Sequence, residues 1–309
     1  MKVAFLFPGQ GSQQLNMLHQ LPKHPIIAAT IEEASAILGE NVLLLDTEMA
    51  LLSTRAVQLA LLIAGVAAGR ALKAEGALPD IVAGHSVGSF AAAVIAGALE
   101  FADALVLVQL RGQLMEKAYP KGYGMGVITG LDERRVALLT EQVRALIIPV
   151  YVANINAPDQ ITIAGSHEGI QAVFTFARSA GAQKIQFLNV SVPSHCNLLQ
   201  EVADTLVSKM ATIHVQYPSI PYIGNCRARS LKRVEDIRTD LGIGVANPVR
   251  WHDVTTLMFE LGVRFFVEVG TGQTLTNMAR KAFPTARSMS MEDSGLESIT
   301  ILTKREKEK

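Results

Sequence analysis

The feature that most constrains this chain is the pentapeptide Gly-His-Ser-Val-Gly at residues 84–88. The apolar run 81–83 before it predicts a buried strand, and the run 90–99 after it predicts a buried helix. A G-x-S-x-G sequence between a strand and a helix is typical of a nucleophile elbow, in which glycines permit a sharp, crowded turn. Such a turn projects the Ser86 hydroxyl out of the fold at a helix N-terminus, which favours developing negative charge. A turn with a purely structural role is the alternative.

The composition describes a chain that can bury a large core. Of its 309 residues, 49% are hydrophobic and 18% are charged, which suits one large domain with an insertion, or two domains. Lysine plus arginine and aspartate plus glutamate both number 28. Because the formal net charge is zero, neither nucleic acid nor an anionic membrane is expected as a partner.

The sequence does not point to secretion, to a membrane span or to a metal site. Cys196 and Cys226 are too few for a disulfide framework, and no metal-ligand spacing surrounds them. The apolar N-terminal segment breaks at Pro8-Gly9, too early for a signal peptide. The most apolar predicted helix, residues 56–71, is expected in the core and is too short to cross a bilayer. We therefore expect a soluble cytoplasmic protein without a metal.

Two candidate site residues come from the regions on either side of the elbow. Residues 3–7 predict a buried strand, and Gln10 follows it in a loop that could line a cleft at the strands' carboxyl ends; a simple turn is the alternative. Arg111 falls on the apolar face of a helix predicted over residues 101–117. A buried guanidinium needs an anionic partner. Either a structural ion pair or a substrate carboxylate, bound bidentately, could serve.

The pattern of elements changes at Gly124. The predicted strands are 125–129, 150–155, 160–164 and 184–190, with helices at 133–146 and 168–180. Their order, β-α-β-β-α-β, is that of the ferredoxin-like split motif. We expect residues 124–190 to form a small inserted domain. Residues 1–123 and 191–309 are then expected to form a large α/β domain, α/β-hydrolase-like, with a parallel sheet.

His195 is the best candidate for a base. Ser194 is a suitable N-cap for a helix predicted over residues 196–210, which places His195 in the first turn. There the helix dipole disfavours the imidazolium and keeps a neutral base available. A capping or surface role is the alternative for His195. His85 is adjacent to Ser86, but neighbouring side chains in a tight turn point apart, so it is the weaker candidate.

Six short stretches are spread over nearly the whole chain: FPGQGSQ (7–13), GHSVG (84–88), LRG with Arg111, VPSHC (192–196), NPVRW (247–251) and EVGTG (268–272). Together and in this order they resemble one family, the malonyl-CoA:acyl carrier protein transacylases. Residues 124–190 lie where that family has its small subdomain. Six motifs in register are far more specific than the elbow alone.

The resemblance implies a role for five residues. Ser86 is then the acyl nucleophile, and His195 is the general base and acid. Gln10 and the backbone N–H of Val87 would form the oxyanion hole, and Arg111 would bind the free carboxylate of the malonyl group. The implied reaction is ping-pong: malonyl-CoA acylates Ser86, and the pantetheine thiol of an acyl carrier protein then accepts the malonyl group. No permanently bound cofactor is implied.

Some positions differ from the family pattern, and Asn156 matches it. Ser89 and Phe90 replace the Glu and Tyr of GHSLGEY. Gly244 stands where a glutamine carbonyl commonly orients the catalytic histidine, and it keeps that carbonyl. The apolar run 90–94 is similar to the acyltransferase (epsilon) subunit of malonate decarboxylase, which would change only the carrier served. Asn156 matches a family loop near the cleft and is a supporting residue.

Other functions stay open as alternatives. A serine esterase or thioesterase of α/β-hydrolase type shares the elbow, but such enzymes normally add an Asp or Glu between Ser and His in chain order. Asp132 and Asp159 lie there without an obvious route to His195. A catalytically idle subunit that only docks a carrier protein is a third possibility. Within transacylation, a transacylase of fatty-acid synthesis is the alternative to the malonate decarboxylase subunit.

Overall fold

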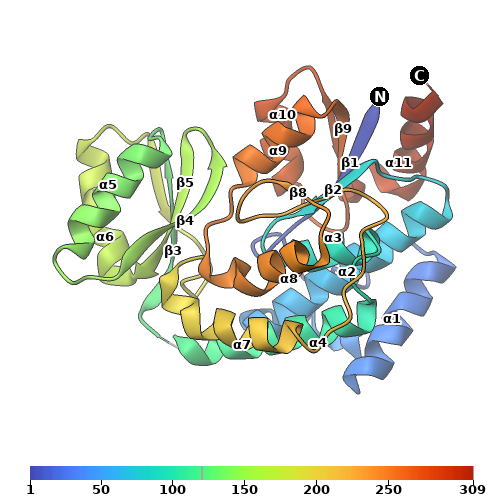
Figure 1. Ribbon diagram of the computed structural model, residues 1–309, viewed down its shortest axis with the longest axis horizontal. Coiled ribbons are helices and arrows are strands. Elements are labelled where there is room, and N and C mark those ends of the chain that lie inside the picture. Colours follow the sequence, from blue (N-terminus) through green and yellow to red (C-terminus); the bar gives the residue numbers. More distant parts are fainter. Residues whose placement is uncertain (120, 309) are drawn as a thin grey trace.

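The computed structural model describes residues 1–119 and 121–308. Two β-sheets and the surrounding helices make up this part of the chain (Figure 1). The strands are β1 (Lys2–Phe7), β2 (Ile81–Gly84), β3 (Tyr123–Thr129), β4 (Val150–Ala157), β5 (Gln160–Ser166), β6 (Lys184–Phe187), β7 (Tyr222–Ile223), β8 (Ser230–Leu231), β9 (Val263–Glu268) and β10 (Arg287–Ser290). The α-helices are α1 (Pro25–Leu38), α2 (Thr54–Ala74), α3 (Gly88–Ile95), α4 (Phe101–Ala118), α5 (Glu133–Arg144), α6 (His167–Ser179), α7 (Gln200–Met210), α8 (Val234–Ile243), α9 (Trp251–Glu260), α10 (Thr274–Ala282) and α11 (Met291–Glu308). The 3-10 helices are η1 (Val42–Leu44), η2 (Ala50–Leu52), η3 (Asn197–Leu199) and η4 (Gly244–Ala246).

The larger sheet places the elbow at its carboxyl edge. Its strand order is β10-β9-β1-β2-β7-β8, and every pair is parallel except β7 with β8. Strands β1 and β2 end level with each other, because Phe7 is the register partner of Gly84. The loops that follow these two strands therefore leave the sheet as neighbours, and they carry Gln10 and Ser86.

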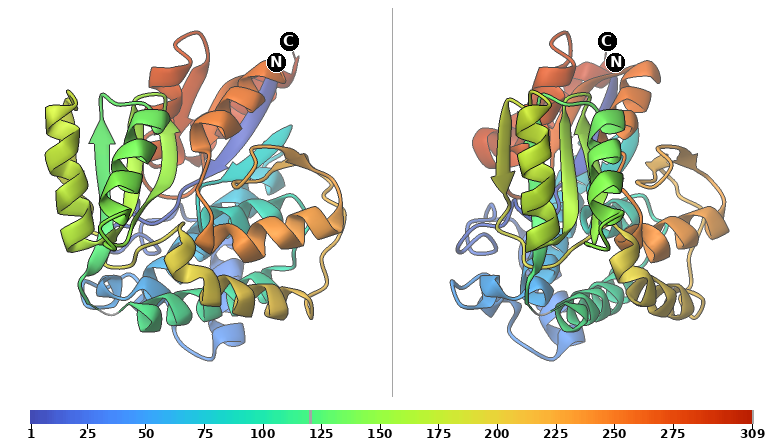
Figure 2. Two further views of the ribbon diagram at one scale, coloured as in Figure 1. Left: turned by 60° about the vertical axis from the view of Figure 1, so that its left-hand side comes forward. Right: turned by 90° about the vertical axis from the view of Figure 1, so that its left-hand side faces the viewer.

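The smaller sheet has the order β4-β5-β3-β6 and is antiparallel throughout. Its elements follow one another as β3-α5-β4-β5-α6-β6, the order that the sequence predicts. Helices α5 and α6 cover the face that points away from the rest of the molecule (Figure 2). Strand β4 is also tied to the segment before α9: Ile155 N–H donates to Val249 O at 2.8 Å, and Val249 N–H donates to Ala153 O at 2.9 Å.

Both faces of the larger sheet are buried, as expected for parallel strands. Along β1, Val3, Phe5 and Phe7 enter one core together with α2, α3 and α4. Ala4 and Leu6 enter a second core together with α9 and α10. This alternation follows from the two-residue period of a strand, and it places helices on both sides of the sheet.

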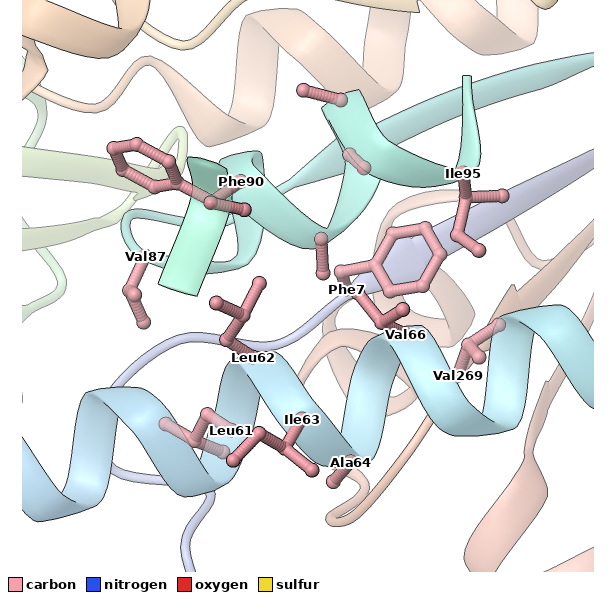
Figure 3. Close-up of a cluster of buried hydrophobic side chains, with 14 of the residues drawn as sticks. Phe7, Leu61, Leu62, Ile63, Ala64, Val66, Val87, Phe90, Ile95 and Val269 are labelled. Atoms are coloured by element: carbon pink, nitrogen blue, oxygen red, sulfur yellow. The ribbon is translucent and has the colours of Figure 1, made fainter. Parts of the chain in front are cut away.

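Helix α2 runs through the larger core. It is long and apolar enough to be considered as a membrane span, but 89% of its most apolar window is buried inside the protein. Figure 3 shows Leu62 and Val66 of this helix in the same cluster as Phe7 and Phe90. Gly65 allows β1 to approach closely, because a Cβ there would lie 3.2 Å from the ring of Phe7. The expectation that this segment is a core helix is confirmed.

Gly84 and Gly88 lie so close to neighbouring backbone atoms that neither position has room for a side chain. A Cβ on Gly84 would lie 2.0 Å from the carbonyl group of Gly88, and a Cβ on Gly88 would lie 2.2 Å from the carbonyl oxygen of Phe7. No side chain fits at either position unless the backbone moves. The contact between β1, β2 and α3 is therefore the reason for a glycine at each end of GHSVG.

Several element boundaries differ from those that the sequence predicts. Helix α3 ends at Ile95 and not at residue 99. Strand β4 continues to Ala157, so Asn156 lies in a strand and not in a loop, because pairing with β5 persists to the turn. Strand β6 ends at Phe187 and not at Val190. Leu188, the first residue after this strand, lines the pocket described below.

We predict that Gly84→Ala lowers the free energy of unfolding by about 2–3 kcal/mol or more, because the clash is with backbone that no side-chain movement relieves. Urea titration followed by circular dichroism measures this change. Gly244→Ala is the matched control, since its φ is −56° and no atom lies within 4 Å of a Cβ there. We expect a change within about 1 kcal/mol for the control; equal losses in both variants would contradict the prediction.

Candidate active site

Ser86 stands in the turn between β2 and α3 in a strained conformation. Its φ is +54°, in the left-handed region that costs a residue with a side chain about 1–2 kcal/mol. Backbone hydrogen bonds hold the turn: His85 N–H donates to Phe7 O at 2.9 Å, and Ser89 N–H donates to Ser86 O at 3.0 Å. The strained turn presents the hydroxyl to a pocket at the carboxyl edge of the larger sheet.

His195 is the hydrogen-bonding partner of this hydroxyl. Its Nε2 lies 2.7 Å from Ser86 Oγ, and its Nδ1 lies 2.7 Å from Gly244 O and 3.3 Å from Asn247 O. Carbonyl oxygens can only accept, so Nδ1 carries the proton and Nε2 is free to accept the proton of Ser86. Backbone carbonyls therefore set the tautomer that a general base requires.

The prediction that His195 lies in the first turn of a helix is wrong. His195 has a φ of +65°, and its N–H donates to Val245 O at 2.7 Å. Ser194 does not cap a helix; its Oγ faces Val192 O, and α7 begins only at Gln200. Hydrogen bonds to η4 hold the backbone here in a conformation that no helix can continue.

Burial keeps the His195 imidazole neutral. The residue is 3% exposed. Desolvation, reinforced by the charge of Arg111, lowers the pKa of His195 to about 3, although the Gly244 carbonyl acts in the opposite direction. From the sequence, a neutral imidazole is expected for a different reason, the dipole of a helix that would begin here, but no helix begins at His195. A neutral base is thus available throughout the neutral pH range.

Arg111 projects from α4 into the same pocket, where no residue that the structure describes offers it an anionic partner. It is 3% exposed, and its Nη2 donates to Ser86 Oγ at 3.2 Å. Its Nη1 is buried and has no hydrogen-bond partner within the described residues. Burial lowers the pKa of Arg111 to about 10, so the group stays charged at neutral pH. An uncompensated buried charge is costly, and an anionic ligand offsets that cost.

One pocket brings together four side chains singled out from the sequence. Its lining includes Gln10, Ser86, Arg111 and His195, which come from the loop after β1, the elbow, α4 and the loop before η3. Apolar side chains complete the wall: Met115, Met125, Leu188 and Val190. A wall of this kind strengthens electrostatic interactions with a bound group, because it lowers the local dielectric constant.

Val87 and Asn156 do not line this pocket, but each adjoins a residue that does: Val87 follows Ser86 in the chain, and Asn156 bonds to His85. Val87 is the N-cap of α3, and its N–H is the first after Ser86 in the chain. Asn156 faces His85 and not Ser86: its Oδ1 lies 3.2 Å from His85 Nε2, and its Nδ2 donates to Thr162 Oγ1 at 3.4 Å. Burial lowers the pKa of His85 to about 4. His85 Nε2 donates to Asn156, and among the described residues the hydrogen-bond partners of Ser86 Oγ are His195 and Arg111, not His85.

Three polar residues at the site were not singled out from the sequence. Asn225 Oδ1 accepts a hydrogen bond from Ser86 N–H at 3.0 Å. Asn154 and Gln58 line the pocket, and each has a buried side-chain oxygen without a partner among the described residues. Only Gln58 carries a sequence signal, as a polar side chain inside the apolar run 56–71. The two asparagines have no distinctive local context.

The polar side chains of the pocket are the hydroxyls of Ser86 and Ser194, the imidazoles of His85 and His195, a guanidinium and amides. Within residues 1–119 and 121–308, no group of three or more His, Cys, Asp or Glu side chains could hold a metal ion. A hydroxyl paired with a base and surrounded by N–H donors suits nucleophilic acyl transfer.

Comparison with known proteins points to the same chemistry. Residues 4–307 match the family described as "Acyl transferase domain". A malonyl CoA-acyl carrier protein transacylase from Escherichia coli (strain K12) is 37% identical over 298 residues, covering 94% of this chain and 96% of the relative. The chain belongs to the malonyl-CoA:acyl carrier protein transacylase family. The resemblance carried by the six motifs is confirmed.

Solved structures of this transacylase family share the fold. A malonyl CoA-acyl carrier protein transacylase from Coxiella burnetii is 36% identical, with a TM-score of 0.94 and coverage of 99% of this chain and 98% of that one. A malonyl-transacylase solved in complex with its type II PKS acyl-carrier protein is 36% identical, with a TM-score of 0.87 and coverage of 94% of both chains. The expected mixed α/β fold is confirmed.

We predict that burial of His195 makes the transacylase less stable as the pH falls below 6.5, the ordinary pKa of histidine. In that range the unfolded chain binds a proton at His195, whereas the folded chain does so only when the pH approaches 3. The unfolded state then holds more protons, so stability is full above pH 6.5 and is lost as the pH decreases. Urea midpoints at about pH 7.5 and about pH 5 measure this loss.

His195→Gln tests the cause of this pH dependence. We expect the difference between the two urea midpoints to shrink in this variant, because the titrating group has been removed. His214→Gln is the control, since His214 is exposed, and we expect it to keep the wild-type difference. A wild-type difference in His195→Gln would show that other groups cause it.

Proposed function

We propose that this transacylase moves a malonyl group from malonyl-CoA to the pantetheine thiol of an acyl carrier protein through a malonyl–Ser86 intermediate. The observation that carries the proposal is the placement of Ser86 Oγ, 2.7 Å from His195 Nε2 and 3.2 Å from Arg111 Nη2. One oxygen is thus next to a base and next to a group that can bind a carboxylate. Relatives named malonyl CoA-acyl carrier protein transacylase support it.

The acylation step uses the tautomer described above. His195 Nε2 takes the Ser86 proton while Oγ forms a bond to the thioester carbonyl carbon. The carbonyl oxygen becomes an oxyanion, which the Val87 N–H and Gln10 stabilise. The C–S bond then breaks, and His195 gives its proton to the departing CoA sulfur. The carrier thiol reverses these steps: it loses its proton to His195, attacks the acyl carbon and releases Ser86 with that proton.

Arg111 supplies selectivity for a carboxylated acyl group. The planar guanidinium can bind the free malonyl carboxylate through two parallel hydrogen bonds, and its Nη1 has no other partner within the described residues. An acetyl group would leave the buried charge unpaired. Losing one partner of a buried charge pair costs roughly 2–5 kcal/mol, which is enough to discriminate strongly between malonyl-CoA and acetyl-CoA.

We assign the two sheets to two domains that frame this site. Residues 1–123 and 191–309 form a large α/β-hydrolase-like domain, which the parallel sheet and the elbow after β2 support. Residues 124–190 form an inserted ferredoxin-like domain, supported by the β4-β5-β3-β6 order of its sheet. In this arrangement Asn156 orients His85 at the junction of the two domains, and Gly244 orients His195.

The serine esterase or thioesterase alternative is less well supported. Enzymes of that type orient the histidine with an Asp or Glu. Here His195 Nδ1 bonds to the carbonyl oxygens of Gly244 and Asn247. A buried Arg111 that has no anionic partner in the described part of the chain also has no task in a generic esterase. A docking subunit without activity would not need Ser86 and His195 at hydrogen-bonding distance.

The carrier protein separates the two transacylase alternatives. A carrier from fatty-acid synthesis and one from malonate decarboxylation, compared in the same malonyl-transfer assay, would show which is the better acceptor.

We propose that this transfer takes place in the cytoplasm. Cys196 and Cys226 are both free thiols, which fits a reducing compartment.

We predict a covalent malonyl adduct on Ser86. Intact-protein mass spectrometry after mixing with malonyl-CoA should show the mass of one malonyl group on the wild type and none on Ser86→Ala. Adding a thiol acceptor should remove the adduct much faster than water does. An adduct that persists on Ser86→Ala would refute the assignment, and equally fast loss to water would favour the hydrolase.

We predict that Arg111→Ala depresses malonyl transfer by roughly 30-fold or more, in line with the loss of a buried charge pair. Transfer of acetyl groups should fall much less, so the malonyl-to-acetyl ratio of kcat/KM should drop. Arg233→Ala is the control, because Arg233 lies on the exposed surface. An unchanged ratio in Arg111→Ala would mean that Arg111 is structural only.

A further inference from the structure

We propose that Asn225 is a positioning residue that holds the nucleophile's backbone in its strained conformation. The proposal rests on the proposed function in one respect: it takes Ser86 as the nucleophile. Asn225 follows β7, which pairs with β2 in the larger sheet, so it lies at the same carboxyl edge as the elbow. It is 4% exposed, and buried polar atoms of this kind need hydrogen-bond partners.

The carboxamide of Asn225 connects the two ends of the turn. Its Oδ1 accepts from Ser86 N–H at 3.0 Å, and its Nδ2 donates to Gly84 O at 2.6 Å. The backbone bonds of the turn use other N–H groups, those of His85, Gly88 and Ser89. A single side chain thus bridges the peptide groups before and after His85, which the turn's own backbone hydrogen bonds do not join. Gly84 O also accepts from Ser89 Oγ at 3.0 Å, but Ser89 does not reach Ser86 N–H.

Asn225 is itself held on several sides. Its N–H donates to Asp240 Oδ2 at 3.1 Å, and its carbonyl accepts from Arg250 N–H at 3.1 Å. Asp240 Oδ1 also accepts from Cys226 N–H at 3.0 Å. Gly224 packs against the same carboxylate, since a Cβ there would lie 2.8 Å from Asp240 Oδ1. The loop therefore provides a rigid support for the carboxamide.

The conformation that Asn225 holds is the one that the reaction uses. Ser86 has a φ of +54°, and a turn released from Asn225 would relax toward a less strained angle. Relaxation would move Oγ away from His195 Nε2 and would turn the Val87 N–H away from the oxyanion position. A displacement of about 1 Å can cost on the order of 100-fold in rate. Arg111 comes from a different element, so binding of malonyl-CoA should change little.

Asn225→Ala removes both hydrogen bonds, and a fluorophosphonate probe reads out the reactivity of Ser86 without malonyl-CoA. In this reaction Oγ forms a bond to phosphorus, fluoride leaves, and the serine proton passes to His195. We expect the labelling rate and kcat to fall roughly 10- to 100-fold, with KM for malonyl-CoA within about threefold of the wild type.

Asn225→Asp is the second variant and covers the case in which Asn225→Ala does not fold. It keeps the size of the side chain and the acceptor for Ser86 N–H, but it places a carboxylate oxygen where Nδ2 donates to Gly84 O. We expect a slower labelling rate here as well, because two acceptors then face each other.

Tyr222→Phe is the matched control. Tyr222 O–H donates to Asp240 Oδ2 at 3.3 Å, so the variant weakens the support without touching the carboxamide. We expect a lower melting temperature and a labelling rate within about twofold of the wild type. Wild-type labelling by the folded Asn225 variants, or an equal loss in Tyr222→Phe, would overturn the proposal. Labelling of the wild type without uptake of malonyl from malonyl-CoA would overturn the proposed function alone.

Discussion

The contact between Ser86 Oγ and His195 Nε2 is 2.7 Å long and joins residues 109 positions apart in the chain. Ser86 lies in a turn where the backbones of β1, β2 and α3 are in close contact. The side chain of Asn225 forms hydrogen bonds to Gly84 O and to Ser86 N–H in this turn. His195 lies in a loop that is hydrogen-bonded to η4: its N–H donates to Val245 O, and its Nδ1 donates to Gly244 O. Neither residue lies within a helix or strand. The contact therefore depends on a parallel sheet that delivers these loops to one edge, and on hydrogen bonds that keep each loop in an otherwise unfavourable conformation.

Burial sets the electrostatics of the pocket, and it acts differently on His195 and Arg111, two of its titratable groups. The imidazole of His195 can lose its charge, so desolvation holds its pKa at about 3. The guanidinium of Arg111 keeps its charge, because even a pKa lowered to about 10 lies well above neutral pH. The two effects are linked, since the charge of Arg111 is the second cause of the low pKa of His195. Under the proposed function, a malonyl carboxylate paired with Arg111 would offset that charge and make His195 a stronger base when the preferred acyl group is bound.

The departures from the family pattern leave this geometry in place. Gly244 acts on His195 through its carbonyl oxygen, which every residue has, and no neighbouring atom lies where its side chain would be. Ser89 Oγ donates to Gly84 O at 3.0 Å and so adds a hydrogen bond to the elbow. Phe90 is 3% exposed and packs into the larger core. Ser89 and Phe90 therefore contribute to the turn and to the core, and both also line a small cavity together with Ser86, Arg111 and His195.

Local sequence patterns were enough to specify the strand–turn–helix around Ser86, the buried α2 and the order of elements in the smaller sheet. These features depend on periodicities and turn residues that lie within a few positions of one another. Six motifs in order were enough for the family. The fold alone decided where His195 lies, because hydrogen bonds to η4, 49 residues away for the Gly244 carbonyl, override the helical pattern around it. It also decided that Arg111 meets a serine and no carboxylate of the described chain, and that Asn225 reaches the elbow. Two residues that meet only because distant segments pack together show no pattern in the residues around either of them. A single sequence therefore does not reveal that they are hydrogen-bond partners.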